Sequence, residues 1–433
     1  MAMDGKELVE KLAKLSQVQS IKDIPQLTHA LFPGTHCPLM GAAMAVGGIK
    51  DSLIVVVGTD ECTYYTKSMT IHSEKFGGID GRCVSVVLDD HDVTFGSAEK
   101  VQEAFKEIIE EYRPQCVFLV TTCVIEIIGD DFDAISEGLS ELYGIPVLPV
   151  HTEHFKCEDH LPGLERTITV CAEMMKSCDS DNSVNLLGQR MGDFATTELY
   201  AMLQQAGVKI GLQLPCGCSV DDIKNAAAAK VNIVVNDIAL PLAQKMQEKF
   251  GIPYVYFNKF VIPEKIYEAY KNLFGYLELE LPEELEGLYQ NAREEIEKNK
   301  GELEGITYIY GNTPYAVFEM NCFLSSLGMV PQVIQTNRYT EADEPYAKEI
   351  LQYTDPYVCK AANIAPLQYV YDVLSPYLYL GHEFGNRLRQ KGIAIVHSDR
   401  ASGMLGFEVT GYLLQQLVKS VREAKEYRKE LCL

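Results

Sequence analysis

Three cysteines of this sequence lie in surroundings that differ from those of its other cysteines. They are Cys37 in GTHCPLMGA, Cys62 in GTDECTYYTKS and Cys123 in TTCVIEIIGDD. Each is flanked by Gly, Thr or Pro and lies in a predicted loop at or near a strand end. Loops at the carboxyl ends of parallel strands converge on one side of a sheet, so residues distant in sequence can meet there. Thiolates that meet in this way can bind one metal ion or cluster together.

Thiolates are the usual ligands of iron–sulfur clusters, because soft anionic sulfur matches the iron ions. Three thiolates are one short of the four that a 4Fe–4S cube usually takes. A fourth ligand would come from another residue or another subunit. From residue type and spacing alone, two interpretations stay open. The three are either ligands of a cluster or unrelated cysteines.

Most of the other cysteines are predicted to be small buried side chains. The sequence has 13 cysteines and begins with MAMDGKELVEKLAKLSQVQS, a charged amphipathic segment without the apolar core of a signal peptide. We therefore expect a reducing, cytoplasmic compartment in which thiols persist. Cys216 and Cys218 form a Cys-x-Cys pair in LPCGCSV. A turn lined with small residues is the simpler interpretation of that pair.

Composition and charge exclude several classes of partner. Of the 433 residues 47% are hydrophobic, and the net charge is −23. Nucleic acids and anionic membranes need a basic surface, so neither is an expected partner. No apolar run approaches the roughly 18 residues that a membrane span requires. The composition predicts a soluble globular protein of two or three domains.

Short apolar runs, such as SLIVVVG at 52–58 and CVFLV at 116–120, are predicted strands and alternate with helical patterns along the whole chain. The alternation predicts βαβ units with parallel sheets, in three Rossmann-like domains around a central cleft. We place the domains at 1–180, the cluster-binding unit, at 181–300, which includes a charged helical connector, and at 301–433. Asp130 and Asp131 precede the helix-like segment FDAISEGLSELYG. They are expected to cap that helix.

Sequence signals for nucleotide binding are missing. The chain has no GxxxxGKS or GxxxxGKT motif, and AVGGIK at 45–50 lacks the spacing of GxGxxG. The chain is therefore not expected to bind ATP through a P-loop, and a dinucleotide-dependent dehydrogenase is disfavoured. Any phosphate chemistry belongs to another polypeptide.

The segment HTEHFKCEDH invites a zinc interpretation, because it spaces His151, His154, Cys157 and His160 three residues apart. Zinc needs four ligands that converge on one point, whereas this spacing spreads side chains around a helix or along a loop. We favour a metal-free loop. His151 or His154 could then line a substrate or cofactor pocket.

Several segments resemble the nitrogenase component 1 family. CPLMGA, ECTYYTKS and TTCVIEIIGDDFDAI resemble its three cluster-cysteine motifs, with separations of 25 and 61 residues between the cysteines. NLLGQRMGDFATTELYAMLQQAG resembles the start of its second domain, and KMQEKFGIPYVYFN a segment near its cofactor pocket. The family includes the nitrogenase α subunit, the scaffold on which its cofactor matures, and subunits of dark-operative protochlorophyllide reductase. The resemblance favours Cys37, Cys62 and Cys123 as cluster ligands.

The resemblance implies further cofactors and partners. It implies a 4Fe–4S or larger cluster at a subunit interface, within a homodimer, heterodimer or α₂β₂ assembly with a second component 1-type subunit. It also implies an ATP-dependent iron-protein reductase that delivers electrons one at a time. A second metallocofactor or a tetrapyrrole substrate would lie in the cleft between the domains.

Two positions bear on which branch of the family the chain follows. Where the nitrogenase α subunit anchors its cofactor through a cysteine, this sequence has Asn236, and a neutral amide cannot replace a thiolate on iron. IVHSDRASGMLGF resembles the segment that carries the cofactor's histidine, with His397 at or near that position. We expect Asn236, His397 and His151 to line a cofactor-binding pocket away from the three cysteines.

These observations predict an oxidoreductase subunit. Electrons would pass from the ATP-dependent reductase through the interface cluster to a substrate or metallocofactor in the cleft. Three alternatives remain. They are a non-catalytic scaffold for cofactor assembly, a tetrapyrrole reductase subunit without a second metal cluster, and a metal-free α/β binding protein.

Overall fold

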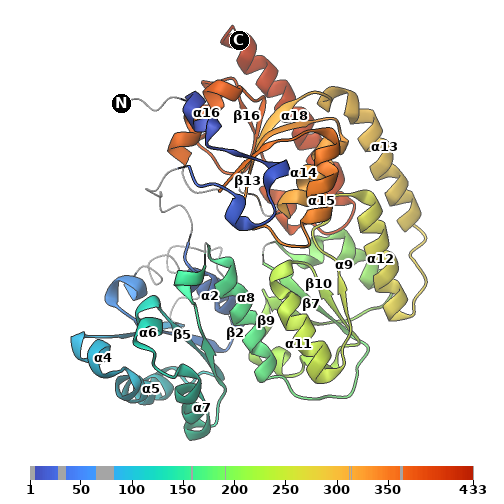
Figure 1. The fold of residues 1–433 in the computed structure, drawn as a ribbon. Coiled ribbons are helices and arrows are strands. Elements are labelled where there is room, and N and C mark those ends of the chain that lie inside the picture. The colour runs from blue at the N-terminus through green and yellow to red at the C-terminus, as the bar shows by residue number, and fades with distance from the viewer. Residues whose placement is uncertain are drawn as a thin grey trace.

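The described residues form three large sheets of mainly parallel strands, each with helices on both faces, and one two-stranded sheet (Figure 1). The computed structural model describes residues 5–27, 36–64, 82–157, 159–190, 192–311, 313, 315–360 and 364–432. Each sheet draws almost all its strands from one continuous stretch of sequence, so three Rossmann-like units follow one another. We refer to them as the first, second and third unit. The predicted α/β class is confirmed, and the domain limits near 180 and 300 stay a prediction.

The first unit has the strand order β4-β3-β5-β6. Every residue of the central strands β3 and β5 is buried, as expected for parallel strands covered on both faces. Helices α5 and α7 cover one face, and α2 and α8 cover the other. The elements are β3 (Ser52–Gly58), β4 (Cys83–Val87), β5 (Cys116–Thr121), β6 (Val147–Val150), α2 (Pro38–Gly47), α4 (Asp90–Phe95), α5 (Ala98–Tyr112), α6 (Cys123–Ile128), α7 (Phe132–Tyr143) and α8 (Leu161–Val170).

The second unit has the strand order β11-β10-β7-β8. Helices α9 and α12 cover one face. Helices α10 and α11 cover the other and share a continuous apolar core with α2 and α8 of the first unit. The elements are β7 (Val184–Gln189), β8 (Ile210–Pro215), β10 (Val231–Val234), β11 (Tyr254–Tyr256), α9 (Glu198–Gln205), α10 (Val220–Lys224), α11 (Leu240–Phe250) and α12 (Pro263–Leu277). The two-residue strands β2 (Ile49–Lys50) and β9 (Cys218–Ser219) also join these two units.

The third unit has the strand order β1-β14-β13-β12-β15-β16. Helices α14, α15 and α18 lie on one face, and α1, α16 and α17 on the other. Helix α13 (Leu285–Leu303) leads into the unit and packs against α18. The remaining elements are β12 (Thr307–Tyr310), β13 (Val330–Gln335), β14 (Tyr357–Cys359), β15 (Leu378–Leu380), β16 (Ala394–Val396), α1 (Gly5–Glu10), α14 (Val317–Ser326), α15 (Glu344–Tyr353), α16 (Ile364–Leu374), α17 (Gly385–Arg389) and α18 (Glu408–Glu430).

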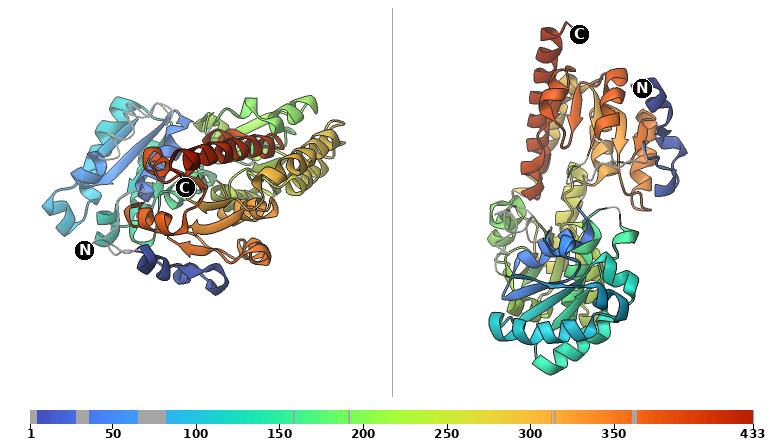
Figure 2. Two further views of the ribbon diagram at one scale, coloured as in Figure 1. Left: turned by 90° about the horizontal axis from the view of Figure 1, so that it is seen from above. Right: turned by 90° about the vertical axis from the view of Figure 1, so that its left-hand side faces the viewer.

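The N-terminal residues lie against the third unit, although from the sequence we expected them in the first domain. Strand β1 (Ala13–Lys14) pairs antiparallel with β14 and extends the third sheet. The backbone N–H and hydroxyl of Ser16 both donate to the Asp355 carboxylate, at 3.0 and 2.8 Å. Figure 2 shows this segment beside the third unit in both views. A two-residue strand carries no apolar pattern that could have predicted the pairing.

None of the helices in the described ranges is both long enough and apolar enough to cross a membrane.

Candidate functional site

The three predicted cluster cysteines lie at the starts of helical segments in the first unit. Cys37 is the residue before α2, and Cys123 is the first residue of α6. Cys62 lies in a helical turn that follows β3. Strands β3 and β5 are parallel neighbours with Val57 opposite Thr121, so the chain leaves both strands at the same edge. The sheet therefore delivers Cys62 and Cys123 to one place.

The structure brings the three thiols together. The Cys62 thiol is in hydrogen-bonding contact with Cys123 and within electrostatic range of Cys37. Burial raises the pKa of Cys62, the neighbouring Cys123 raises it further, and a hydrogen bond with Thr59 opposes both effects. All three cysteines are half-buried. Sulfur atoms grouped in this way form a donor set suited to soft metal ions.

The group fits a multi-iron cluster better than a single ion. Within the described ranges, no three His, Cys, Asp or Glu side chains are close enough to hold one metal ion. Thiolates that bind different irons of one cluster are spaced more widely than the ligands of a single ion, so this finding is compatible with a cluster. The last four residues of the ECTYYTKS motif, 65–68, belong to the range 65–81, which lies outside the described residues. The roles of the three cysteines as ligands stay a prediction.

Large exposed apolar side chains occur on the segments that carry Cys62 and Cys123 and on the elements next to α6. Tyr64 and Ile127, which lie two and four residues after Cys62 and Cys123, are 71% and 70% exposed. Phe95, at the end of α4 and next to α6, is 76% exposed, and Phe155 is 72% exposed. Large exposed apolar side chains in one area mark surfaces that bind other proteins.

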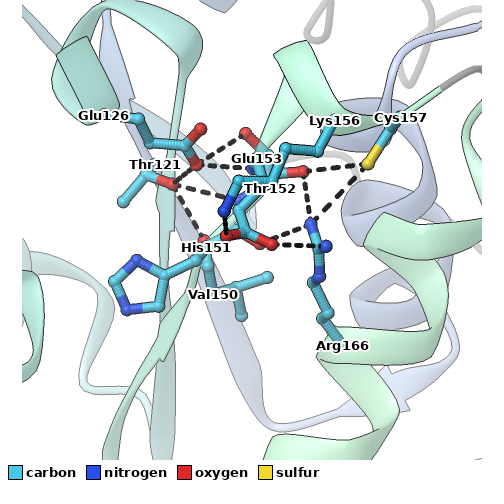
Figure 3. Close-up of polar contacts among 9 residues, drawn as sticks. All are labelled: Thr121, Glu126, Val150, His151, Thr152, Glu153, Lys156, Cys157 and Arg166. Atoms are coloured by element: carbon cyan, nitrogen blue, oxygen red, sulfur yellow. Dashed lines mark hydrogen bonds and ion pairs between the residues drawn. The ribbon is translucent and has the colours of Figure 1, made fainter.

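One helical turn after Cys123, Glu126 takes part in a polar network that joins α6 to the loop after β6 (Figure 3). One carboxylate oxygen of Glu126 accepts hydrogen bonds from the Thr121 hydroxyl at 2.8 Å, the Thr152 hydroxyl at 3.2 Å and the Glu153 backbone N–H at 2.6 Å. Arg166 of α8 donates to the Thr152 carbonyl at 2.6 Å and forms an ion pair with Glu153, also at 2.6 Å. Sequence reasoning missed Glu126. Its only signal was a carboxylate three residues after Cys123.

His151, predicted as a pocket residue, lines a surface cavity of about 340 Å³ next to this network. Its Nε2 lies 3.2 Å from an Asp133 carboxylate oxygen of α7. Glu126, Glu153, Phe155 and Lys156 line the same cavity. The cavity therefore belongs to the first unit, beside the cysteine group.

The four residues of the zinc-like series have four different environments. His151 faces Asp133, His154 stacks on Phe155, Cys157 contacts the Thr152 carbonyl, and the His160 ring meets His36 edge-on. The loop and the short 3-10 helix η4 (His154–Lys156) thus direct the four side chains to different partners.

Asn236 and His397 have different environments. Asn236 is 7% exposed, and its side-chain oxygen accepts from the backbone N–H of Ile238 at 3.2 Å, capping the 3-10 helix η8 (Asp237–Ala239). It packs on Gly188, where an added Cβ would lie 2.9 Å from the Asn236 Cβ. His397 is exposed, and its carbonyl accepts from the Tyr412 hydroxyl at 3.5 Å. In the described part of the chain no hydrogen bond joins the two residues, and their shared pocket stays a prediction.

The two predicted capping aspartates divide their roles. Asp131 accepts from the Ala134 backbone N–H at 2.9 Å and caps α7, which confirms that expectation. Asp130 accepts instead from the backbone N–H and hydroxyl of Ser97, at 2.7 and 2.6 Å. Because Ser97 directly precedes α5, Asp130 holds the start of α5 against the end of α6.

A second charged group, missed from the sequence, lies where the three units meet. It contains Arg190, Lys259 and Arg338, which follow strands β7, β11 and β13. Arg338 forms long ion pairs with Asp159 of the first unit at 3.8 Å and with Asp237 of the second unit at 3.7 Å. The ammonium group of Lys259 donates to the Ser402 carbonyl of the third unit. We call this group the three-unit junction.

Fold and sequence comparisons agree on the class of protein. An α/β chain of three Rossmann-like units, with thiols gathered at the carboxyl edge of the first sheet, resembles two solved structures of nitrogenase Cp1. At pH 6.5 the TM-score is 0.78, with 14% identity over 94% of this chain and 96% of the other; at pH 5 it is 0.63, with 19% identity over 91% and 89%. At these identities the likeness shows the fold. The chain belongs to the nitrogenase component 1 type oxidoreductase family, whose model matches residues 37–422.

Several curated relatives have names that refer to cofactor assembly. The nitrogenase iron-molybdenum cofactor biosynthesis protein NifE of Clostridium pasteurianum is 31% identical over 51% of this chain and 49% of its own length. The NifE protein of Rippkaea orientalis is 24% identical over 73% and 69%. The nitrogenase molybdenum-iron protein alpha chain of Methanosarcina barkeri is 24% identical over 72% and 62%. The chain thus spans about half to two thirds of the length of these relatives.

Proposed function

We propose that this chain is an electron-transferring component 1-type subunit that binds an iron–sulfur cluster through Cys37, Cys62 and Cys123. The observation that carries the proposal is the grouping of the three thiols at one edge of the first sheet. When bound, the cluster supplies one-electron redox chemistry. The protein supplies position, partial burial and exclusion of water.

A second component 1-type subunit would complete the site. Three cysteines leave a cube-type cluster one ligand short, and the apolar side chains around them suit a protein partner. Tyr64, Ile127 and Phe155 would be buried on assembly, covering the cluster from solvent. A homodimer, a heterodimer and an α₂β₂ assembly all satisfy this requirement.

Electrons would enter from a separate ATP-dependent iron protein, since the chain has no P-loop of its own. They would leave toward a substrate or metallocofactor at the three-unit junction. Asn236 stands where the resemblance to the nitrogenase α subunit expects an anchoring thiolate, and its side-chain oxygen already caps η8. The proposal therefore favours a ligand held by charge and hydrogen bonds over a metal cluster anchored at Asn236.

A second candidate is a scaffold on which a metallocofactor is assembled and from which it is passed on. The names of the NifE relatives favour it, and a cofactor that must leave is better held without an anchoring thiolate. The two candidates share the cluster cysteines and differ in the fate of the electrons. Turnover with the partner ATPase and a reductant identifies the enzyme, whereas transfer of a preformed cofactor to another protein identifies the scaffold.

Metal analysis of cysteine variants tests the proposal. The chain is purified without oxygen, and iron and acid-labile sulfide are measured in C37A, C62A and C123A. Each should lose most of the iron, because removing one ligand from a shared set destabilises the whole cluster. C322A and C359A are matched controls at buried cysteines of the third unit and should keep wild-type iron. Equal iron loss in both groups, or no iron in the wild type, contradicts the proposal.

A further inference from the structure

The four strands of the second sheet are followed, at the same edge, by two cations of the three-unit junction and by two further residues. Arg190 follows β7, Cys216 follows β8, Asn236 follows β10 and Lys259 follows β11. In the sheet order β11-β10-β7-β8, the chain goes from β7 to β8 on one side of β7 and later forms β10 and β11 on the other side. The reversal falls between β7 and β10, and ligands of open α/β sheets bind outside the carboxyl ends of the strands at such a point. Arg190 stands directly at it.

The other two units close over this edge. In the third unit the 3-10 helix η9 (Asp399–Gly403) lies against it, with the Ser402 carbonyl on Lys259 and the Gly403 carbonyl on the side-chain amide of Gln189 at 3.4 Å. From the first unit, His160 and Asp159 at the start of α8 lie within electrostatic range of Arg190. The junction is thus built from all three units.

Two cations at the junction form no ion pair with a carboxylate among the described residues, although Asp237 and Asp159 lie within electrostatic range of Arg190. Lys259 is 6% exposed, and among the described residues its ammonium group donates one hydrogen bond, to the neutral Ser402 carbonyl. The half-buried Arg190 guanidinium lies within ion-pair or hydrogen-bonding distance of no described residue. A positive charge removed from water without a partner is costly. Two such charges at one sheet edge and within electrostatic range of each other suit an anionic ligand.

Neighbouring groups do not supply the missing anion. Burial raises the pKa of the Cys216 thiol, which stays neutral and lies 3.2 Å from the Arg190 carbonyl. Asp159 and Asp237 form ion pairs with Arg338, and from further away they raise the pKa of Arg190 against the larger effect of burial. Burial lowers the pKa of His160 to about 4, so this imidazole adds no charge at neutral pH. Burial, and then the nearby Arg190 charge, lower the pKa of Lys259 to about 7, as expected for a lysine that lacks a counter-charge.

We propose that Arg190 and Lys259 bind one carboxylate of the ligand at the three-unit junction, so that the substrate or cofactor of this chain is a carboxylic acid. The planar guanidinium suits a two-point contact with a carboxylate, and the ammonium group adds a point charge from the end of β11, which β10 separates from β7. The acids Asp159, Asp237, Asp343 and Glu165 also lie around the junction. They favour a singly charged group over doubly charged phosphate. The ligand's role in turnover rests on the proposed function. The binding test below does not depend on that function.

Binding of small anions to the full-length, anaerobically purified chain tests the inference. Thermal unfolding is followed at pH 6.5 with sodium propionate, sodium phosphate or sodium chloride at matched ionic strength. Propionate should raise the unfolding midpoint by about 2 °C over chloride at a concentration well above its dissociation constant. R190Q and K259M should lose this difference. R190K should keep part of it, because the charge remains and the two-point geometry does not. R293Q and K298M change exposed residues of α13 and should behave as wild type.

The pH dependence of the propionate effect separates anion binding by Lys259 from a purely structural role of this residue. Because the proposed carboxylate favours charged Lys259, the propionate effect should weaken as the pH rises from 6.5 to 8.5, and K259R should remove this weakening. An equal propionate effect in wild type, R190Q and K259M overturns the inference, as does a phosphate effect larger than that of propionate or no propionate effect in the wild type. Iron analysis of the same samples reports separately on the proposed function, since an iron-free wild type contradicts that function and leaves the anion result standing.

Discussion

At the scale of single residues, the cysteines differ in burial and in grouping according to where they lie in the fold. Cys37, Cys62 and Cys123 are half-buried and grouped, whereas Cys359 lies inside a strand and is fully buried. Flanking residues in the sequence already separated the two kinds, because Gly, Thr and Pro mark loops and apolar neighbours mark the interior. Asn236 could not be interpreted in this way, since an amide at a strand end suits a cap and a ligand equally.

Asn236 should act through the turn that it caps. N236A removes the acceptor for the Ile238 N–H and should lower the stability of the second unit by about 1 kcal/mol, within the usual range for losing a cap. N236D keeps the acceptor and should stay close to wild type. Thermal unfolding of the purified variants measures the effect. Iron content should remain at the wild-type level in both, and a large iron loss in N236A would show that the residue takes part in metal binding.

At the scale of elements, long buried strands were predictable and short ones were not. The runs SLIVVVG and CVFLV predicted β3 and β5 almost to the residue, since a parallel strand buried on both faces must be apolar throughout. Strands β14 and β15 have three residues each, too few for any pattern. They exist because longer neighbours offer them backbone partners. Arg190 and Lys259 were missed for a related reason, since nothing in the sequence says that the strands before them end at the same edge of one sheet.

Helix α6 offers a test at this scale, because a single side chain joins it to the loop after β6. E126A removes the acceptor of three hydrogen bonds and leaves the Glu153 N–H and two threonine hydroxyls without it. The expected cost is about 2–3 kcal/mol, seen as a lower unfolding midpoint and as partial iron loss from the displaced Cys123. E126Q retains a side-chain oxygen and should lose less. E137A, at an exposed position of α7, is the matched control, and equal midpoints for E126A and E137A would refute the coupling.

At the scale of the whole molecule, three units are joined by a few polar contacts as well as by apolar packing. The α/β class and the three-unit organisation followed from the alternation of strand and helix patterns. The contacts between units did not, because they join residues more than a hundred positions apart, such as Lys259 and Ser402. The family resemblance supplied the cysteine group, and its agreement with local composition made that part of the site predictable.

Glu198 of α9 forms one of the joints between the second and third units. One of its carboxylate oxygens accepts from the Tyr270 hydroxyl at 2.9 Å and from the backbone N–H of Phe407, just before α18, at 3.0 Å. Burial raises the pKa of Glu198 to about 7, opposed by these hydrogen bonds and aided by the nearby Glu408 charge. The folded chain therefore holds a proton on Glu198 at pH values where the unfolded chain releases it.

This joint predicts a pH dependence of stability with a definite sign. Since the folded pKa of about 7 lies above the ordinary 4.5, the stabilisation by protonated Glu198 is complete below about pH 4.5 and is lost as the pH rises through 7. E198Q carries a permanently neutral amide, so it should unfold near the wild-type midpoint at pH 5 and above it at pH 8. The gain at pH 8 should be on the order of 1–2 kcal/mol, because the side chain is half-buried and solvent screens part of the effect. E294Q, at an exposed position of α13, should show no such gain. An E198Q midpoint that tracks the wild type from pH 5 to 8 would mean that Glu198 is ionised throughout and that the second and third units meet through a charged joint.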